Sequence, residues 1–429
     1  MSNRRTFIKQ IGGLAGAIAF TDLLSPFSAN GFNDVFKNIA ELAPAEAAKD
    51  EDFWGWIKEC FTVTPNVINL NNGGVSPQPK VVQDAVIRFY QLANEGPAYY
   101  MNKMLGEGRE SLRMRLADLA GCSTEEIAIN RNTTEAINTV IFGLNLKAGD
   151  EVLLARQDYP SMRNAWEQRV KRDGIKLNYL NLNLPLENEK EIVRIYEDAF
   201  TDKTKVVMIM HMINYNGQIM PVKEIARAAH KRGIEVLVDG AHTFAHLDFK
   251  IPDLECDYFG TSLHKWLCAP FGTGLLYIKK EKIKNIWPLL SDNNPDRDDI
   301  RKFESLGTRS IPNEMAIAHA IDFHNIIGSK RKEERMRYLK NYWTDNVSKL
   351  PKVSINTSSK PELSCGLAHF SIEGKTAKEI ESILFDKFKI YSAVMEIENI
   401  KGIRITPHLY IATKDLDRLI EAIKFISKS

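Results

Sequence analysis

Glu235-Val-Leu-Val-Asp-Gly-Ala-His242 and Ser262-Leu-His-Lys265 are the two stretches of this chain that decide its fold. The apolar run ending at Asp239 has the length and composition of a buried strand. The separation between Asp239 and Lys265, 265 − 239 = 26 residues, is about that of one α/β unit. Both side chains are therefore expected at the carboxyl edge of one sheet, where ligands bind in such folds.

A lysine and a carboxylate at one sheet edge suit pyridoxal 5′-phosphate (PLP). The lysine amine forms an imine with the PLP aldehyde, and the carboxylate keeps the pyridine nitrogen protonated so that the ring withdraws electrons. Trp266 and Leu267 give Lys265 an apolar setting, which disfavours the ammonium form and lowers the pKa of the lysine. Ser262 and His264 can donate hydrogen bonds to a phosphate placed beside the imine.

A metal site is the competing interpretation of the first stretch. Asp239, His242 and His246 have metal-ligand spacing, which would suit a metallohydrolase. The glutamate of the H-E-x-x-H motif is missing, because Thr243 follows His242. This interpretation also leaves Lys265 without a role, so we expect no metal.

A helix start further upstream offers a place for the phosphate. Asn132-Thr-Thr-Glu135 follows the strand-like segment 126–130 and opens an amphipathic helix. Thr133 and Thr134 would present hydroxyl and backbone N–H groups where the helix dipole favours an anion. An ordinary capping box would produce the same pattern.

The remaining pattern predicts an α/β protein with two domains. Short apolar runs at 151–155, 205–211 and 274–278 alternate with helical periodicity such as that of 222–233, which indicates a mostly parallel sheet between helices. We assign 46–320 to this large, PLP-binding domain. A long helical segment from Asn313 towards Leu350 leads into a β-α-β-α order, so 321–429 is predicted to be a smaller α+β domain.

The first 45 residues are predicted to be an export signal and a linker. Arg4-Arg5, an aromatic Phe7 and the weakly apolar run from Ile11 to Phe20 are typical of a twin-arginine signal. We expect the twin-arginine export machinery to carry the folded protein to the periplasm or beyond. A membrane anchor is the alternative, although the run is short for a bilayer.

Composition excludes several other classes of protein. A net charge of +2 without a long basic run gives no reason to expect nucleic acid as a partner. The five cysteines are scattered without a C-x-x-C pair, so neither a disulfide framework nor a zinc ribbon is indicated.

Five motifs follow one another along the chain: Thr133-Thr-Glu-Ala136, Asn214-Tyr-Asn-Gly-Gln218-x-x-Pro221, Asp239-Gly-Ala-His242, Ser262-x-His264-Lys265 and Gly307-Thr308. Together they resemble the class V aminotransferases, which are fold-type-I PLP enzymes with a sheet of the seven-stranded type. The superfamily includes the cysteine desulfurases, kynureninase and isopenicillin N epimerase. Two further motifs resemble the isopenicillin N epimerase branch more closely than the desulfurases: Asn69-Leu-Asn-Asn-Gly-Gly74-x-Ser-Pro77 and Asp158-Tyr159-Pro160.

The resemblance implies a role for each residue around the PLP ring. Lys265 would be the Schiff-base lysine and would move the proton at the substrate Cα. Asp239 would pair with the pyridinium nitrogen, and His242 and Asn214 would bond the ring hydroxyl. Tyr159 occupies the position of the aromatic side chain that stacks on the cofactor.

The resemblance also implies a phosphate site shared between two subunits. Thr133, Thr134, Ser262 and His264 would hold the phosphate from one subunit. Thr308 would arrive from the second subunit, which makes the protein a homodimer with shared active sites.

Gly402-Ile-Arg-Ile-Thr-Pro407 resembles the arginine motif in the C-terminal domain of the family. A guanidinium at Arg404 would clamp the substrate carboxylate and fix which Cα bond stands perpendicular to the ring. Desulfurases carry a nucleophilic cysteine shortly before this arginine. The segment 391–401 contains none, which disfavours sulfur transfer.

The function implied is that of a PLP-dependent, isopenicillin-N-epimerase-like enzyme acting at the Cα of an amino acid or related amine. An aminotransferase or a Cβ-eliminating lyase remains an alternative, because each would use the same Lys265, Asp239 and Arg404. A PLP-fold protein that has lost catalysis and only binds is a further alternative. The retention of these three residues argues against it.

Overall fold

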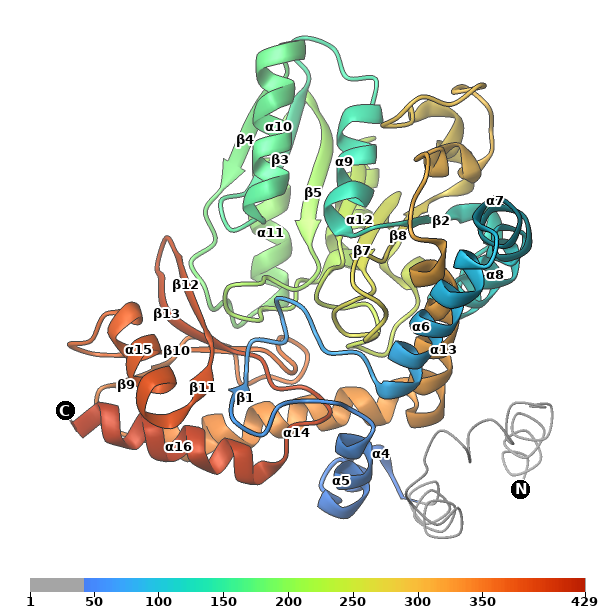
Figure 1. Ribbon diagram of the computed structural model, residues 1–429. Helices are drawn as coiled ribbons and strands as arrows, with labels where there is room; N and C mark the ends of the chain where they lie inside the picture. Colours follow the sequence, from blue (N-terminus) through green and yellow to red (C-terminus); the bar gives the residue numbers. More distant parts are fainter. Residues whose placement is uncertain (1–41, 429) are drawn as a thin grey trace.

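The computed structural model describes residues 42–428 of the chain (Figure 1). The twin-arginine motif predicted at Arg4-Arg5 and the apolar run after it lie outside the described residues. Among residues 42–428, no helix combines the length and apolar character that a bilayer span requires.

A seven-stranded sheet forms the centre of the larger part of the molecule, with strand order β2-β8-β7-β6-β5-β3-β4. Its strands are parallel except β8, which runs antiparallel to both β7 and β2. The predicted mostly parallel sheet is therefore confirmed. The strands are β2 (Ile127–Asn130), β3 (Glu151–Ala155), β4 (Lys176–Leu180), β5 (Thr204–Met210), β6 (Glu235–Asp239), β7 (Tyr258–Ser262) and β8 (Gly274–Ile278).

Helices cover both faces of this sheet (Figure 1). Alternate residues of each strand enter two different cores, since successive side chains of a strand point to opposite faces. In β3, Val152 and Leu154 pack with the helices α9 and α10, whereas Leu153 packs with α8, α11 and α12. Burial on both sides explains why the strands read as continuous apolar runs. The helices are α8 (Arg109–Ala120), α9 (Thr133–Gly143), α10 (Pro160–Asp173), α11 (Glu189–Ala199) and α12 (Val222–His230).

The helical segment predicted from Asn313 towards Leu350 is two helices rather than one. Gly328 has a φ of 89° and separates α13 (Ile311–Ile327) from α14 (Ser329–Val347). A positive φ is readily adopted only by glycine, so the chain turns there instead of continuing a helix.

The C-terminal part is the predicted smaller α+β unit. Its antiparallel sheet has the order β12-β13-β10-β9, and α15 and α16 pack in the core with α14. The elements are β9 (Val353–Ile355), β10 (Ala368–Ile372), α15 (Ala377–Phe388), β11 (Ile390–Tyr391), β12 (Ala393–Ile397), β13 (Ile400–Ile405) and α16 (Thr413–Lys428).

The N-terminal segment of the described chain packs against this C-terminal unit. Phe53 and Trp54 are buried in the same core as Trp343, and β1 pairs in parallel with β11 through Ile68 and Ile390. The segment after β1 forms a bridge from Asn71 to Thr406, just after β13, and continues to α6, which lies along α13 (Figure 1). The boundaries near residues 45 and 320 stay predictions. The elements are α4 (Pro44–Ala47), α5 (Glu51–Glu59), β1 (Ile68–Asn69), α6 (Lys80–Asn94), α7 (Pro97–Tyr99) and η1 (Tyr100–Leu105).

Short 3₁₀ helices complete the connections between these elements. They are η2 (Thr124–Glu126), η3 (Ile251–Leu254), η4 (Lys280–Asn285) and η5 (Ile300–Glu304). The last of them leads into the loop that carries Gly307-Thr308.

Gly217 joins the two parts of the molecule where no side chain fits. Its φ is 79°, and a Cβ there would lie 2.3 Å from the carbonyl oxygen of Leu367. We expect Gly217→Ala to lower the free energy of unfolding by about 3 kcal/mol or more, since strain and a backbone clash combine. Gly233→Ala is the matched control, because its φ is 69° but no atom lies within 4 Å. That variant should lose only about 1 kcal/mol. Equal losses in denaturant unfolding would contradict the predicted clash.

Candidate active site at the carboxyl edge of the sheet

Lys265 and Asp239 meet at the carboxyl edge of the large sheet, as the spacing predicted. Asp239 is the last residue of β6 and is 3% exposed. Lys265 follows the end of β7 by three residues, and Lys265 Nζ lies 3.4 Å from His242 Nε2. The loop after β6 and the loop after β7 thus place a lysine, a carboxylate and an imidazole in one small region.

Burial shifts the pKa values of both Lys265 and Asp239 towards their neutral forms. Burial lowers the pKa of Lys265 to about 8, against the opposing charge of Asp239, while the charge of Arg404 lowers it further. Burial raises the pKa of Asp239, although the Ala241 N–H and the charge of Lys265 oppose this. A buried carboxylate of this kind is stabilised by a cationic N–H partner. The lysine amine, in turn, loses its proton more readily than an exposed lysine.

Two buried polar atoms beside this group have no hydrogen-bond partner among the described residues. They are Asn214 Oδ1 and His242 Nδ1, on side chains that are each 4% exposed. A buried polar atom left unpaired costs free energy, so such atoms indicate a ligand with polar groups. These are the residues predicted to bond the ring hydroxyl of PLP, and the chemistry of the two atoms fits that role.

The predicted phosphate residues come together at the N-terminus of α9. The Ser262 hydroxyl lies 2.9 Å from the backbone nitrogen of Thr133 and 2.8 Å from its hydroxyl. Asn132 is the N-cap, since its side chain accepts from the Glu135 N–H at 2.9 Å. Thr133 and Thr134 therefore occupy the first turn, where the helix dipole favours an anion.

His264 lies in the same loop as Lys265. Its Nδ1 is 3.0 Å from the Thr273 carbonyl oxygen, which fixes the ring of this partly exposed side chain. Its contact with a phosphate stays a prediction.

Two of the predicted site residues, Tyr159 and Thr308, are exposed. Tyr159 is the residue before α10 and is 41% exposed. Thr308 is exposed in the loop between η5 and α13. The stacking role of Tyr159 and the contribution of Thr308 to a second subunit stay predictions.

Arg404 reaches the site from β13 of the C-terminal unit and is 3% exposed. Its guanidinium donates to the Asn214 carbonyl oxygen at 2.9 Å and to Asn71 Oδ1 at 2.8 Å. It makes no ion pair with any carboxylate in residues 42–428, and Arg404 Nε has no hydrogen-bond partner there. Burial lowers its pKa to about 10. A buried cation without a counter-ion is costly, which indicates that an anionic ligand group binds here.

Asn71 and Gly73 belong to the site, although sequence reasoning gave neither a role. Gly73 N donates to Thr406 Oγ1 at 2.9 Å, just after β13. A Cβ on Gly73 would lie 3.3 Å from both Arg404 Cζ and His242 Cε1, so glycine leaves room for a ligand between these two side chains. The Asn69–Gly74 motif could have indicated this contribution, but it was used only as a resemblance to a family branch.

The five cysteines lie in environments that suppress thiolate formation. Cys256, Cys268 and Cys365 are buried, and Cys60 and Cys122 are partly buried. Burial raises the pKa of all five thiols, to about 11 for both Cys60 and Cys268. Since a nucleophilic cysteine needs a lowered pKa, none of them has the environment of a sulfur-transfer nucleophile.

His246 is not available to the metal site considered above. Its Nδ1 lies 2.7 Å from the His242 carbonyl oxygen, and its Nε2 accepts from the Gly366 N–H at 3.1 Å. Both ring nitrogens are therefore occupied by backbone groups. Across residues 42–428, no cluster of three or more histidine, cysteine or acidic side chains has the arrangement of a metal site.

Residues 68–396 match the family model described as "Aminotransferase class-V". Isopenicillin N epimerase of Amycolatopsis lactamdurans is 30% identical over 394 residues, which is 87% of this chain and 99% of that protein. The enzyme of the same name from Streptomyces clavuligerus is 29% identical, with 86% and 97% covered. A cysteine desulfurase of Haloferax volcanii is 27% identical, with 84% and 89% covered.

Solved structures of related enzymes share the fold. The apo cysteine desulfurase of Thermococcus onnurineus superposes with a TM-score of 0.76 at 23% identity, covering 87% of this chain and 97% of that one. A cysteine desulfurase of Escherichia coli gives a TM-score of 0.76 at 21% identity, with 90% and 99% covered. The similarity thus extends over both the large sheet and the C-terminal unit.

Proposed function

The chain belongs to the class V aminotransferase family and is a PLP-dependent enzyme, and we propose that it inverts the configuration at the Cα of an amino acid or amino-acid derivative. The isopenicillin N epimerases support this proposal, since the alignments with them extend over almost the whole of each relative. Family membership does not by itself fix the reaction. Support for the type of reaction must therefore come from the chemistry of the site.

The residues at the sheet edge fit PLP. Lys265 would attach the cofactor, Asp239 would lie at its ring nitrogen, and Asn214 and His242 offer two unpartnered buried atoms to its hydroxyl group. The first turn of α9 and Ser262 would hold the phosphate. When bound, PLP supplies an electron sink that stabilises negative charge at the substrate Cα.

The environment of Arg404 is the single observation that supports α-amino acids as the substrate class. Arg404 is a buried cation beside Asn214 with no carboxylate partner in the described chain. A substrate α-carboxylate would supply the missing charge and accept two parallel hydrogen bonds. This contact would fix the substrate so that the Cα–H bond points towards Lys265. The site therefore suits α-amino acids better than simple amines.

Lys265 would move the proton at Cα. Its pKa of about 8 leaves a useful fraction of neutral amine near neutral pH, which is where a general base works best. Return of a proton to the other face of Cα gives the opposite enantiomer. Proton return elsewhere would give transamination, and loss of a Cβ substituent would give elimination.

Proton and product analysis in D₂O separates these outcomes. The holoenzyme would be incubated with a panel of L- and D-amino acids and their peptide-like derivatives. The proposal expects one substrate to lose its Cα–H signal and to yield the opposite enantiomer by chiral chromatography. Stoichiometric formation of a 2-oxo acid from the cofactor-loaded enzyme would assign it instead as an aminotransferase. Release of ammonia with an unsaturated or oxo product would assign it as a lyase. Retention of every Cα–H signal would favour the binding protein.

We also propose that the protein is a homodimer exported by the twin-arginine pathway. The exposed position of Thr308 in its own subunit is compatible with a role in a second subunit.

The proposed export rests on Arg4-Arg5 and the apolar run that follows. Cell fractionation of a chain with Arg4→Lys and Arg5→Lys checks it. Unchanged export of that variant would reject the twin-arginine route.

A further inference from the structure

The loop that carries Thr308 is fixed at both ends but free at its tip. It connects η5, which ends at Glu304, to α13, which begins at Ile311. At the tip, Gly307 has a φ of 70° and an open environment, and Thr308 is exposed. The Thr308 hydroxyl makes no hydrogen bond with any residue of 42–428. The tip of the loop is therefore accessible to a second molecule.

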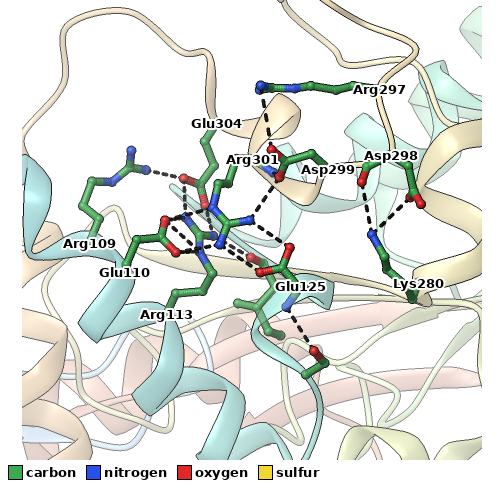
Figure 2. A network of polar contacts seen from close by, with 12 residues as sticks. Arg109, Glu110, Arg113, Glu125, Lys280, Arg297, Asp298, Asp299, Arg301 and Glu304 are labelled. Atoms are coloured by element: carbon green, nitrogen blue, oxygen red, sulfur yellow. Dashed lines mark hydrogen bonds and ion pairs between the residues drawn. The ribbon is translucent and has the colours of Figure 1, made fainter.

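Glu304 fixes the first end of the loop. Its side chain is 3% exposed and accepts from Arg113 Nη1 at 2.5 Å and from the Ile129 N–H of β2 at 2.7 Å. Figure 2 shows this carboxylate between Arg109 and Arg113, two residues on the same face of α8. The start of the loop is thereby tied to a strand of the large sheet.

Glu314, in the first turns of α13, fixes the second end. Its side chain is 8% exposed and pairs with Arg309 of the loop itself. Arg309 Nη1 also donates to the Glu304 carbonyl oxygen at 3.2 Å, which closes the base of the loop.

Arg109 bridges the two ends. Its Nη2 lies 2.7 Å from Glu304 Oε2, and its Nε lies 2.8 Å from Glu314 Oε2. The planar guanidinium therefore sets the distance between two carboxylates that stand ten residues apart (314 − 304 = 10) on either side of Thr308. Without Arg109, Glu304 would keep its ion pair with Arg113 and Glu314 its ion pair with Arg309, but no side chain of residues 42–428 would pair with both carboxylates.

We propose that Arg109 is a positioning residue, which holds the 305–310 loop in the shape that lets Thr308 reach the cofactor phosphate of the partner subunit. This inference rests on the proposed dimeric site, because it gives Arg109 no direct contact with the cofactor. Arg109 acts only through the loop. Replacement of Arg109 should therefore weaken PLP binding only in a protein that retains Thr308.

The surrounding network supplies a matched control. Arg301 forms ion pairs with Glu110, Glu125 and Asp299, beside Arg113 (Figure 2). It touches neither Glu304 nor Glu314 through its side chain. Arg301→Gln thus removes an arginine of the same network without releasing the loop.

The test is a double-mutant cycle on the dissociation constant of PLP, measured by the visible absorbance of the reconstituted apoprotein. We expect Thr308→Ala and Arg109→Gln each to raise this constant about tenfold, the usual effect of losing one hydrogen bond to a charged group. We expect the double variant to be no weaker than either single variant, because Arg109 acts through Thr308. Arg301→Gln should bind PLP like the parent protein.

The outcomes separate this inference from the proposed dimeric site. Unchanged PLP affinity in Thr308→Ala would show that Thr308 does not contact the phosphate. The proposed role of Arg109 would be rejected with it. If Thr308→Ala weakens PLP binding and Arg109→Gln weakens it further by the same factor in the double variant, the role of Arg109 is rejected. The placement of Thr308 in the dimeric site would then stand. Arg109→Gln should fold, because Arg113 still holds Glu304. If it does not, Arg109→Lys serves in its place: it retains the charge, cannot bridge both carboxylates, and should show the same dependence on Thr308.

Discussion

Lys265→Ala is expected to abolish the visible absorbance of the lysine-bound cofactor and to lower turnover by at least about 10³-fold. Attachment of the cofactor and proton movement at Cα are both assigned to this one amine, and general acid–base catalysis alone contributes about 10²–10⁴-fold. Absorbance spectra and single-turnover assays with the substrate found in the D₂O panel would measure both losses. Normal turnover in the variant would reject the central assignment of the site.

Lys332 is not placed to substitute for Lys265. Lys332 is buried, and burial lowers its pKa to about 8, but its Nζ donates to the carbonyl oxygen of Trp266. That contact holds Lys332 on the core side of the Lys265 loop. Lys279→Ala is a suitable control, because Lys279 is a partly exposed lysine after β8 that pairs with Glu281. It should leave spectrum and turnover unchanged.

The core of the site could be predicted from sequence because its residues lie at strand ends. Asp239 closes an apolar run, and Ser262 and Lys265 follow the next strand of the sheet. Parallel strands bring their carboxyl ends to one edge, so strand periodicity alone places these residues together. Asn130, at the end of β2, lies at the same edge, which brings the first turn of α9 into the site as expected.

The contribution of the N-terminal segment could not be predicted in this way. β1 pairs with β11 across 390 − 68 = 322 residues, and this pairing sets Asn71 and Gly73 beside Arg404. Local periodicity carries no information on which distant strand is the partner. The break at Gly328 is a similar case, since helical periodicity continues on both sides of it and only the positive φ ends α13.

Arg404→Met is expected to lower kcat/KM for α-amino acids by about 10²–10⁴-fold, which is what two hydrogen bonds to a charged group contribute. Amines that lack a carboxylate have nothing to place against the guanidinium. They should therefore change by only a few-fold. The measurement is a comparison of matched pairs, each an amino acid and its decarboxylated amine. Equal losses for both members of a pair would show that Arg404 does not bind the carboxylate.

A control variant separates the clamp from its supports. Asn71→Ala removes one hydrogen-bond acceptor from the guanidinium but leaves the Asn214 carbonyl oxygen in place. We expect a smaller loss of kcat/KM than for Arg404→Met, with the same preference for substrates that carry a carboxylate.

Arg404→Met should lower activity without lowering the thermal stability of the apoprotein. Burying an arginine without a carboxylate partner costs free energy, and Arg404 recovers only two hydrogen bonds to uncharged acceptors. Methionine fills a similar length of space without a charge, so the thermal midpoint of Arg404→Met apoprotein should be unchanged or raised. A residue kept only to join β13 to the Asn214 loop would behave differently, because its loss would lower the midpoint by several degrees. Lost activity with retained or increased stability is therefore the result that identifies Arg404 as a ligand-binding residue.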